Sequence, residues 1–86
     1  MKTDPIGEWL RSTRIITRFC SQNGWIDDES LRYEVSSEWN GRLRVNVYFT
    51  EVVMDGAGGV AGRIECFGQL ALQLDREGRV VGAEIV

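Results

Sequence analysis

Residues 36–49, SSEWNGRLRVNVYF, decide the fold, because they set an Asn-Gly pair between two segments in which apolar and polar residues alternate. Asn-Gly is the strongest short-range signal for a β-hairpin. A two-residue turn at Asn40 and Gly41 would nevertheless set a polar row of the first strand against an apolar row of the second. We therefore expect a three-residue loop that begins at Trp39 and holds Gly41 in the left-handed conformation of a bulged turn. The predicted cross-strand pairs are Glu38–Arg42, Ser37–Leu43, Val35–Val45, Tyr33–Val47 and Leu31–Phe49.

The same requirement for apolar pairing extends the sheet toward the C-terminus. The glycine-rich residues 56–62 lack the spacing and the Gly-Lys-Ser/Thr ending of a phosphate-binding loop, so we interpret them as a flexible hairpin tip. A bulge is expected near Val52 and Val53, or at Gly62 or Gly68. Residues 75–78 predict a four-residue turn into a last strand. The predicted pairs are Phe49–Cys66, Val47–Gly68, Val45–Leu70 and Leu43–Leu72, followed by Leu72–Val81, Leu70–Ala83 and Gly68–Ile85.

Residues 4–24, DPIGEWLRSTRIITRFCSQNG, have the signals of one helix, with Asp4 placed to cap it, Pro5 at its first position and Gly24 just beyond its end. Trp25 is expected to fold back onto the helix end as a hydrophobic contact. At 3.6 residues per turn the helix is amphipathic. Its apolar side comprises Ile6, Trp9, Leu10, Thr13, Ile16, Phe19 and Cys20, and its solvent side comprises Arg11, Arg14 and Arg18.

These elements predict an α+β fold in which an N-terminal amphipathic helix packs on one face of a four-stranded antiparallel meander of order 1-2-3-4. Residues 1–86 are expected to form a single domain, because 86 residues support one hydrophobic core and are too few for two. The compactness favours a bacterial or phage-like protein.

The composition, 43% hydrophobic and 27% charged with a net charge of −3, is that of an ordinary acidic globular domain. We expect a cytoplasmic protein with no membrane association, because no apolar run approaches the length that crosses a bilayer and the N-terminus lacks a secretory pattern. Cys20 and Cys66 are interpreted as reduced thiols. The acidic balance disfavours nucleic acid as a partner.

The sequence predicts no enzyme, no catalytic residues, no metal and no cofactor. Histidine, the commonest general base and metal ligand, is absent. The acidic residues Asp27, Asp28 and Glu29 lack the pattern of a calcium loop and are interpreted as a polar connector. Strand alternation aims Glu51 toward the core, but we expect the strand to bulge or end there so that its carboxylate reaches water.

The uncovered face of the sheet carries the candidate binding residues Arg32, Arg44, Tyr48, Arg63 and Phe67, with Tyr48 opposite Phe67, Arg32 beside Tyr48 and Val86 beside Phe67. We interpret this face as a protein-interaction surface, for self-association through the face or an edge strand or for another protein, because aromatic residues and arginine are enriched in interfaces. A solvated face is one alternative. Another is a stacking platform for single-stranded nucleic acid, which Glu34, Glu38, Glu65 and Glu84 on the same face oppose. A third is a small-ligand pocket between helix and sheet near Glu51, Trp9 or Trp25.

Overall fold

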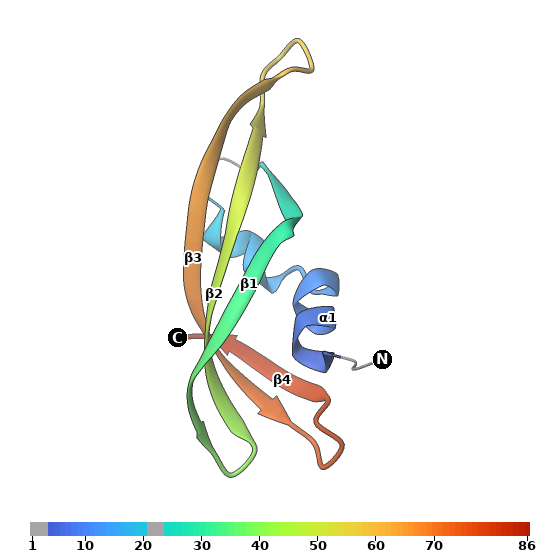
Figure 1. The fold of residues 1–86 in the computed structure, drawn as a ribbon, viewed down its shortest axis with the longest axis vertical. Coiled ribbons are helices and arrows are strands. Elements are labelled where there is room, and N and C mark those ends of the chain that lie inside the picture. The colour runs from blue at the N-terminus through green and yellow to red at the C-terminus, as the bar shows by residue number, and fades with distance from the viewer. Residues whose placement is uncertain (1–3, 21–23) are drawn as a thin grey trace.

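The computed structural model describes residues 4–20 and 24–86 and has the predicted α+β arrangement. A short helical region comes first, formed by α1 (Pro5–Ser12) and the 3₁₀ helix η1 (Ile15–Phe19). It precedes four strands, β1 (Trp25–Trp39), β2 (Arg42–Met54), β3 (Val60–Leu74) and β4 (Val80–Ile85). The strands form one antiparallel sheet in the order β1-β2-β3-β4 (Figure 1).

The predicted continuous helix over residues 4–24 is wrong. Its start is confirmed, because Pro5 is the first helical residue and the Asp4 carboxylate accepts a hydrogen bond from the Gly7 N–H at 3.1 Å. The helix ends at Ser12, and Thr13 is extended with φ −80° and ψ 153°. The following stretch contains Ile15, Ile16 and Thr17, whose β-branched side chains disfavour helix.

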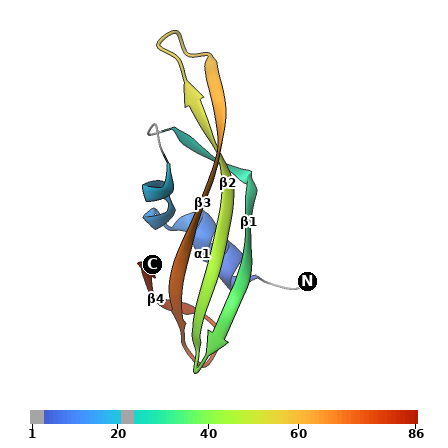
Figure 2. The same ribbon diagram turned by 90° about the vertical axis from the view of Figure 1, so that its left-hand side faces the viewer.

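The break divides the helical region into two segments that pack on different strands of the sheet. α1 contacts β1 and β4, whereas η1 contacts β3, and Figure 2 shows the two segments at different heights along the strands. The predicted sides are nevertheless kept, since Leu10 and Ile16 are buried and the three arginines, Arg11, Arg14 and Arg18, are exposed.

The end of the predicted helix is also corrected. Residues 21–23 lie outside the described residues, and Gly24 precedes β1 instead of capping a helix. Trp25 does not fold back, because it belongs to β1, lies opposite Val52 and remains 71% exposed. The expected polar connector, residues 27–29, likewise belongs to β1.

The β1–β2 hairpin satisfies both the turn preference and the apolar pairing. Asn40 and Gly41 have φ values of 50° and 76°, as a two-residue turn with two left-handed residues requires, and Trp39 pairs with Arg42. The predicted three-residue loop is therefore wrong. One extra residue of β1, Ser36, forms a bulge, after which the predicted pairs Val35–Val45 and Tyr33–Val47 are confirmed.

The bulge changes the pairing only near the turn. Glu38 lies opposite Leu43 instead of Arg42, and Ser37 lies opposite Arg44 instead of Leu43. A second irregularity sets residues 28–31 opposite the single residue Phe49, so the predicted Leu31–Phe49 pair is absent from the ladder.

The β2–β3 register is confirmed at all four predicted pairs, and the expected irregularity lies between Val53 and Met54, opposite the segment that contains Gly62. A hairpin tip is confirmed, but it spans residues 55–59 and not 56–62, because residues 60–62 belong to β3. Within it the Asp55 carboxylate accepts hydrogen bonds from the N–H groups of Ala57 and Gly59.

The β3–β4 register is displaced by two residues from the prediction. Leu72 pairs with Ala83 and Leu70 with Ile85, because the turn is one residue longer than expected and β4 contains a bulge next to Val80. The Val86 N–H consequently donates to the Gln69 carbonyl and does not lie beside Phe67. A displacement of two residues keeps Ala83 on its predicted face. Because of the bulge, the first two residues of β4 lie on the faces opposite to those predicted: Val80 packs against the core and Val81 is exposed.

The core lies between the helical region and one sheet face, which we call the core face. Its buried side chains are Leu10, Ile16, Leu43, Val45, Val47, Phe49, Cys66, Leu70 and Leu72. Gly68 on β3 permits close approach of η1, since a Cβ at this position would overlap the Phe19 ring. The other side, which we call the open face, has no helix over it among the described residues (Figures 1 and 2).

Candidate functional site: the open face of the sheet

The open face exposes large aromatic side chains along its whole length. Trp25, Phe67 and Trp39 are 71%, 76% and 72% exposed. They lie level with positions 52, 48 and 42 of β2. At 3.3 Å per residue, Trp25 and Phe67 are therefore about 13 Å apart along the strands, and Phe67 and Trp39 are about 20 Å apart. Aromatic residues are enriched in protein interfaces, so this face is the candidate interaction surface.

The middle of the open face contains three of the five predicted site residues. Arg32, Tyr48 and Phe67 lie side by side on β1, β2 and β3, as the sequence predicted. The Arg32 guanidinium lies 5.5 Å from the centroid of the Tyr48 ring, in a cation–π arrangement. Its terminal nitrogen is also 3.8 Å from the Glu65 carboxylate.

Acidic side chains hold this middle row in place. The Tyr48 hydroxyl donates to the Glu34 carboxylate at 2.9 Å, and this hydrogen bond is the main cause of a raised Tyr48 pKa. The Asn46 amide also donates to Glu34, at 3.3 Å, and accepts from the Gln69 amide at 3.2 Å. The polar groups at the centre of the face are thus already paired with one another.

The other two predicted residues lie at opposite ends. Arg63 is level with Val52 and forms an ion pair of 3.4 Å with Asp27. Arg44 lies eight residues away along β2, a distance of about 26 Å. The five residues therefore share one face but do not form one cluster.

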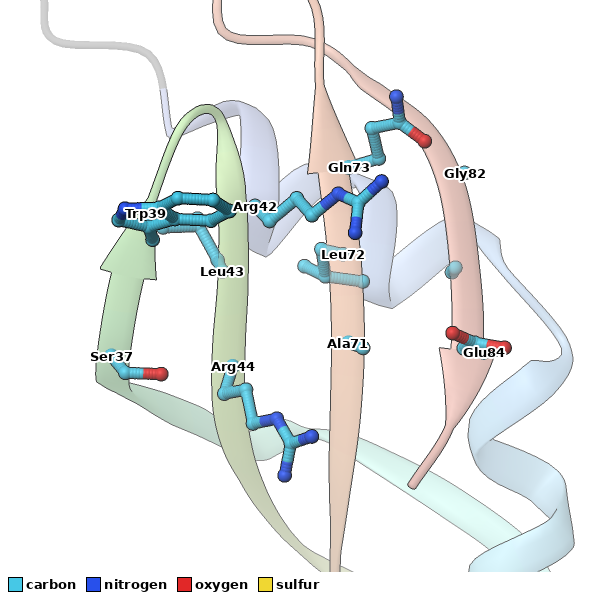
Figure 3. A pocket seen from close by; sticks show the side chains of 11 residues that line it. Ser37, Trp39, Arg42, Leu43, Arg44, Ala71, Leu72, Gln73, Gly82 and Glu84 are labelled. Atoms are coloured by element: carbon cyan, nitrogen blue, oxygen red, sulfur yellow. The ribbon is translucent and has the colours of Figure 1, made fainter.

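Arg44 belongs to a groove that the sequence reasoning missed. The groove has a volume of about 460 Å³, and its small-residue floor is made by Ala71 and Gly82, which leave the surface between larger side chains unfilled. Figure 3 shows the Arg42 and Arg44 side chains extending from β2 across this floor, with the Trp39 indole at one end and Glu84 at the other. Its lining comprises Ser37, Trp39, Arg42, Leu43, Arg44, Ala71, Leu72, Gln73, Gly82, Ala83 and Glu84.

Trp39 joins this groove because of the two-residue turn. The turn pairs Trp39 with Arg42, which sets both side chains on the open face, whereas a three-residue loop would have left Trp39 in the connection. The preference of Asn-Gly for a two-residue turn, taken alone, would have predicted this position of Trp39. Among the described residues, neither Arg42 nor Arg44 forms an ion pair.

The two edges of the sheet are poor surfaces for strand addition. Edge strand β1 is interrupted by the bulge at Ser36 and by the irregularity at residues 28–31. Edge strand β4 spans only Val80–Ile85. Bulges and short edge strands are the features with which proteins prevent edge-to-edge pairing, so the open face is the better candidate for an interaction surface.

Glu51 is buried, and the expectation that it reaches water is wrong. Its side chain is 0% exposed, and its carboxylate accepts a hydrogen bond of 2.6 Å from the Gly24 N–H. The Cys66 thiol also points to this carboxylate, with 3.7 Å between sulfur and oxygen. The carboxylate thus ties the start of β1 to β2, which gives it a structural role.

The two thiols near Glu51 are held in their neutral form. Burial, and secondarily the Glu51 charge, raises the pKa of Cys20 to about 11 and also raises the pKa of Cys66. Because the thiolate is the reactive species, these cysteines are poor nucleophiles at neutral pH. No group of three side chains suited to hold a metal ion occurs among residues 4–20 and 24–86.

The pocket expected between helix and sheet takes a different position. A groove of about 530 Å³ lies between α1 and the β3–β4 turn, and of the three expected side chains only Trp9 lines it. Glu51 is buried beside Gly24 and Cys66, and Trp25 lies on the open face. The groove is lined by Pro5, Glu8, Trp9, Ser12, Glu77, Arg79 and Val80, and ligand binding there stays a prediction.

No family model matches this chain, and neither a curated protein nor a solved structure matches it. No helix within the described ranges has the length and apolar character needed to cross a membrane.

Proposed function

We propose that this chain is a non-enzymatic interaction domain that self-associates through the open face of its sheet. The observation that carries the proposal is the exposure of Trp25, Phe67 and Trp39 on the same uncovered face. Tryptophan, tyrosine and arginine are the residue types that dominate binding energy at protein interfaces. Tyr48 and Arg44 on this face complete that set.

A second copy of the chain is the favoured partner for two reasons. The face combines a protruding aromatic side chain, Phe67, with an open groove, so one surface contains both a shape and its complement. Closed symmetric dimers use such a self-complementary surface twice. The interrupted β1 edge and the short β4 edge favour the face over edge-to-edge pairing.

The test is the mass of the protein in solution, measured by size-exclusion chromatography with light scattering. The wild type is expected at twice the 9.7 kDa of one chain. Phe67→Glu places a charge in the centre of the face and is expected to give the 9.7 kDa monomer with unchanged far-UV circular dichroism. Val60→Glu introduces the same charge at the exposed first residue of β3, at the far end of the strand from the proposed contact, and is expected to remain dimeric. A monomeric wild type, or a dimer that survives Phe67→Glu, would contradict the proposal.

Single-stranded nucleic acid is the second candidate, because Arg32, Tyr48 and Phe67 together resemble a stacking platform for bases. Glu34 and Glu65 flank this row on its two sides and repel phosphates. This candidate predicts binding of a short oligothymidylate that weakens steeply with salt and is lost on Tyr48→Ala. Absence of binding at low salt would exclude it.

A further inference from the structure

The protruding Phe67 and the groove lie on the same strand of the same face. Phe67 and Ala71 are four residues apart on β3, so both point to the open face about 13 Å from each other. Phe67 is 76% exposed, and Ala71 is part of the groove floor between the Arg42 and Arg44 side chains and β4 (Figure 3). The residue midway between them is Gln69.

We propose that two copies of this chain pack open face to open face, with antiparallel strands, about a two-fold axis that passes beside Gln69, so that Phe67 of each copy enters the groove of the other. The inference rests on the proposed self-association and adds the register in which the two sheets face each other. A two-fold axis perpendicular to the strands brings together residues equally distant from it in opposite directions. Phe67 of one copy then lies over Ala71 of the second copy, and the same contact occurs twice.

The same axis produces a matching contact on β2. Asn46 lies opposite Gln69, so Tyr48 of one copy faces Arg44 of the second copy. Arg44 forms no ion pair with a described residue, and a guanidinium over a tyrosine ring is favourable. The Tyr48 ring already bears Arg32 of its own chain beside it, at 5.5 Å from the ring centroid.

The twist of the sheets and the amide pair at the axis are compatible with this register, whereas the two Glu34 carboxylates beside the axis oppose it. Aligned sheets pack about 10 Å apart with strands rotated by about 30°. A contact two residues from the axis is then displaced sideways by only about 3 Å, which side chains accommodate. At the axis itself the Gln69 and Asn46 amides bond each other, so burial leaves this donor and acceptor satisfied.

Exchanging the protruding and the small residue tests the register. Phe67→Ala removes the aromatic ring and Ala71→Phe fills the groove floor, and each alone is expected to raise the dimer dissociation constant about tenfold or more. The double variant Phe67→Ala/Ala71→Phe places a ring opposite a small residue again, so its dissociation constant is expected to return to within about threefold of the wild type. Sedimentation equilibrium measures these constants, and circular dichroism shows that each variant is folded. Val60→Ala, which trims an exposed side chain at the start of β3, is the control and should leave the constant unchanged.

The outcomes separate the register from the proposed function. If Phe67→Glu dissociates the dimer but the double exchange is no tighter than the weaker single variant, the face mediates association and the register is overturned. A wild-type monomer, or a dimer indifferent to Phe67→Glu, overturns both. A wild-type monomer that binds oligothymidylate through Tyr48 would assign the face to nucleic acid and also overturn the register.

Discussion

Replacing Gly68 by alanine should destabilise the protein through one steric contact. Gly68 lies on β3 opposite Val47, and a Cβ added to it would overlap three ring carbons of Phe19 on η1. Its φ is not in the left-handed region, so the backbone itself accepts alanine. Overpacking of this kind costs about 1–3 kcal/mol. A loss of about 2 kcal/mol lowers the Tm of a domain of this size by about 8–16 °C.

Two controls test this steric explanation: alanine at another glycine of β3, and removal of the Phe19 ring. Apart from its chain neighbours, no described atom lies within 4 Å of a Cβ added at Gly62, so Gly62→Ala should stabilise by about 0.4–1 kcal/mol through the same restriction of the unfolded chain that is expected below for Gly68. In a Phe19→Ala background the clash is absent, and Gly68→Ala should then stabilise by about 0.4–1 kcal/mol because it restricts the unfolded chain. Urea unfolding followed by tryptophan fluorescence measures all four variants. The packing of η1 on the sheet would be refuted if Gly68→Ala were no more destabilising than Gly62→Ala, or if its cost persisted without the Phe19 ring.

Three further predictions concern the turn, the dimer axis and the partly buried side chains of Cys20 and Tyr33. Because Asn40 has a φ of 50°, Asn40→Val should cost about 1–2 kcal/mol in urea unfolding while Asn40→Gly costs less than about 0.5, and tolerance of valine would argue for the three-residue loop. Glu34 is level with Asn46, so the proposed axis brings the Glu34 carboxylates of the two copies together. Glu34→Gln should therefore lower the dimer dissociation constant about threefold at low salt. A higher dissociation constant would contradict this placement of the axis. Burial raises the pKa of Cys20 from 9.0 to about 11 and that of Tyr33 from 10.0 to about 12, so the associated stability is complete below pH 9.0 and is lost as pH rises through 11 and 12. Urea midpoints measured between pH 8 and pH 12 should therefore decrease, and Cys20→Ala should remove part of the decrease. A midpoint that is flat across this range would contradict the raised pKa of both groups.

Much of the candidate site follows from strand alternation alone. Tyr48 opposite Phe67 and Arg32 beside Tyr48 were predicted from the two registers, because the central strands alternate strictly between apolar and polar residues. Trp39 and the groove were not predicted. The prediction treated the turn preference of Asn40-Gly41 and the apolar pairing as incompatible, whereas the bulge at Ser36 satisfies both.

The sequence by itself determined the meander, the face on which each central strand residue lies and the start of the helix. These features depend on short-range rules, namely the two-residue period of a strand and the capping of helical N–H groups by Asp4. Only the tertiary structure decided where the helix breaks and that Glu51 is buried. Both depend on contacts between distant residues: Phe19 must reach Gly68, and the Glu51 carboxylate obtains its hydrogen bond from Gly24, 27 residues away. Local patterns do not encode such contacts, because the partner that offsets the cost of burying a charge becomes available only when the chain is folded.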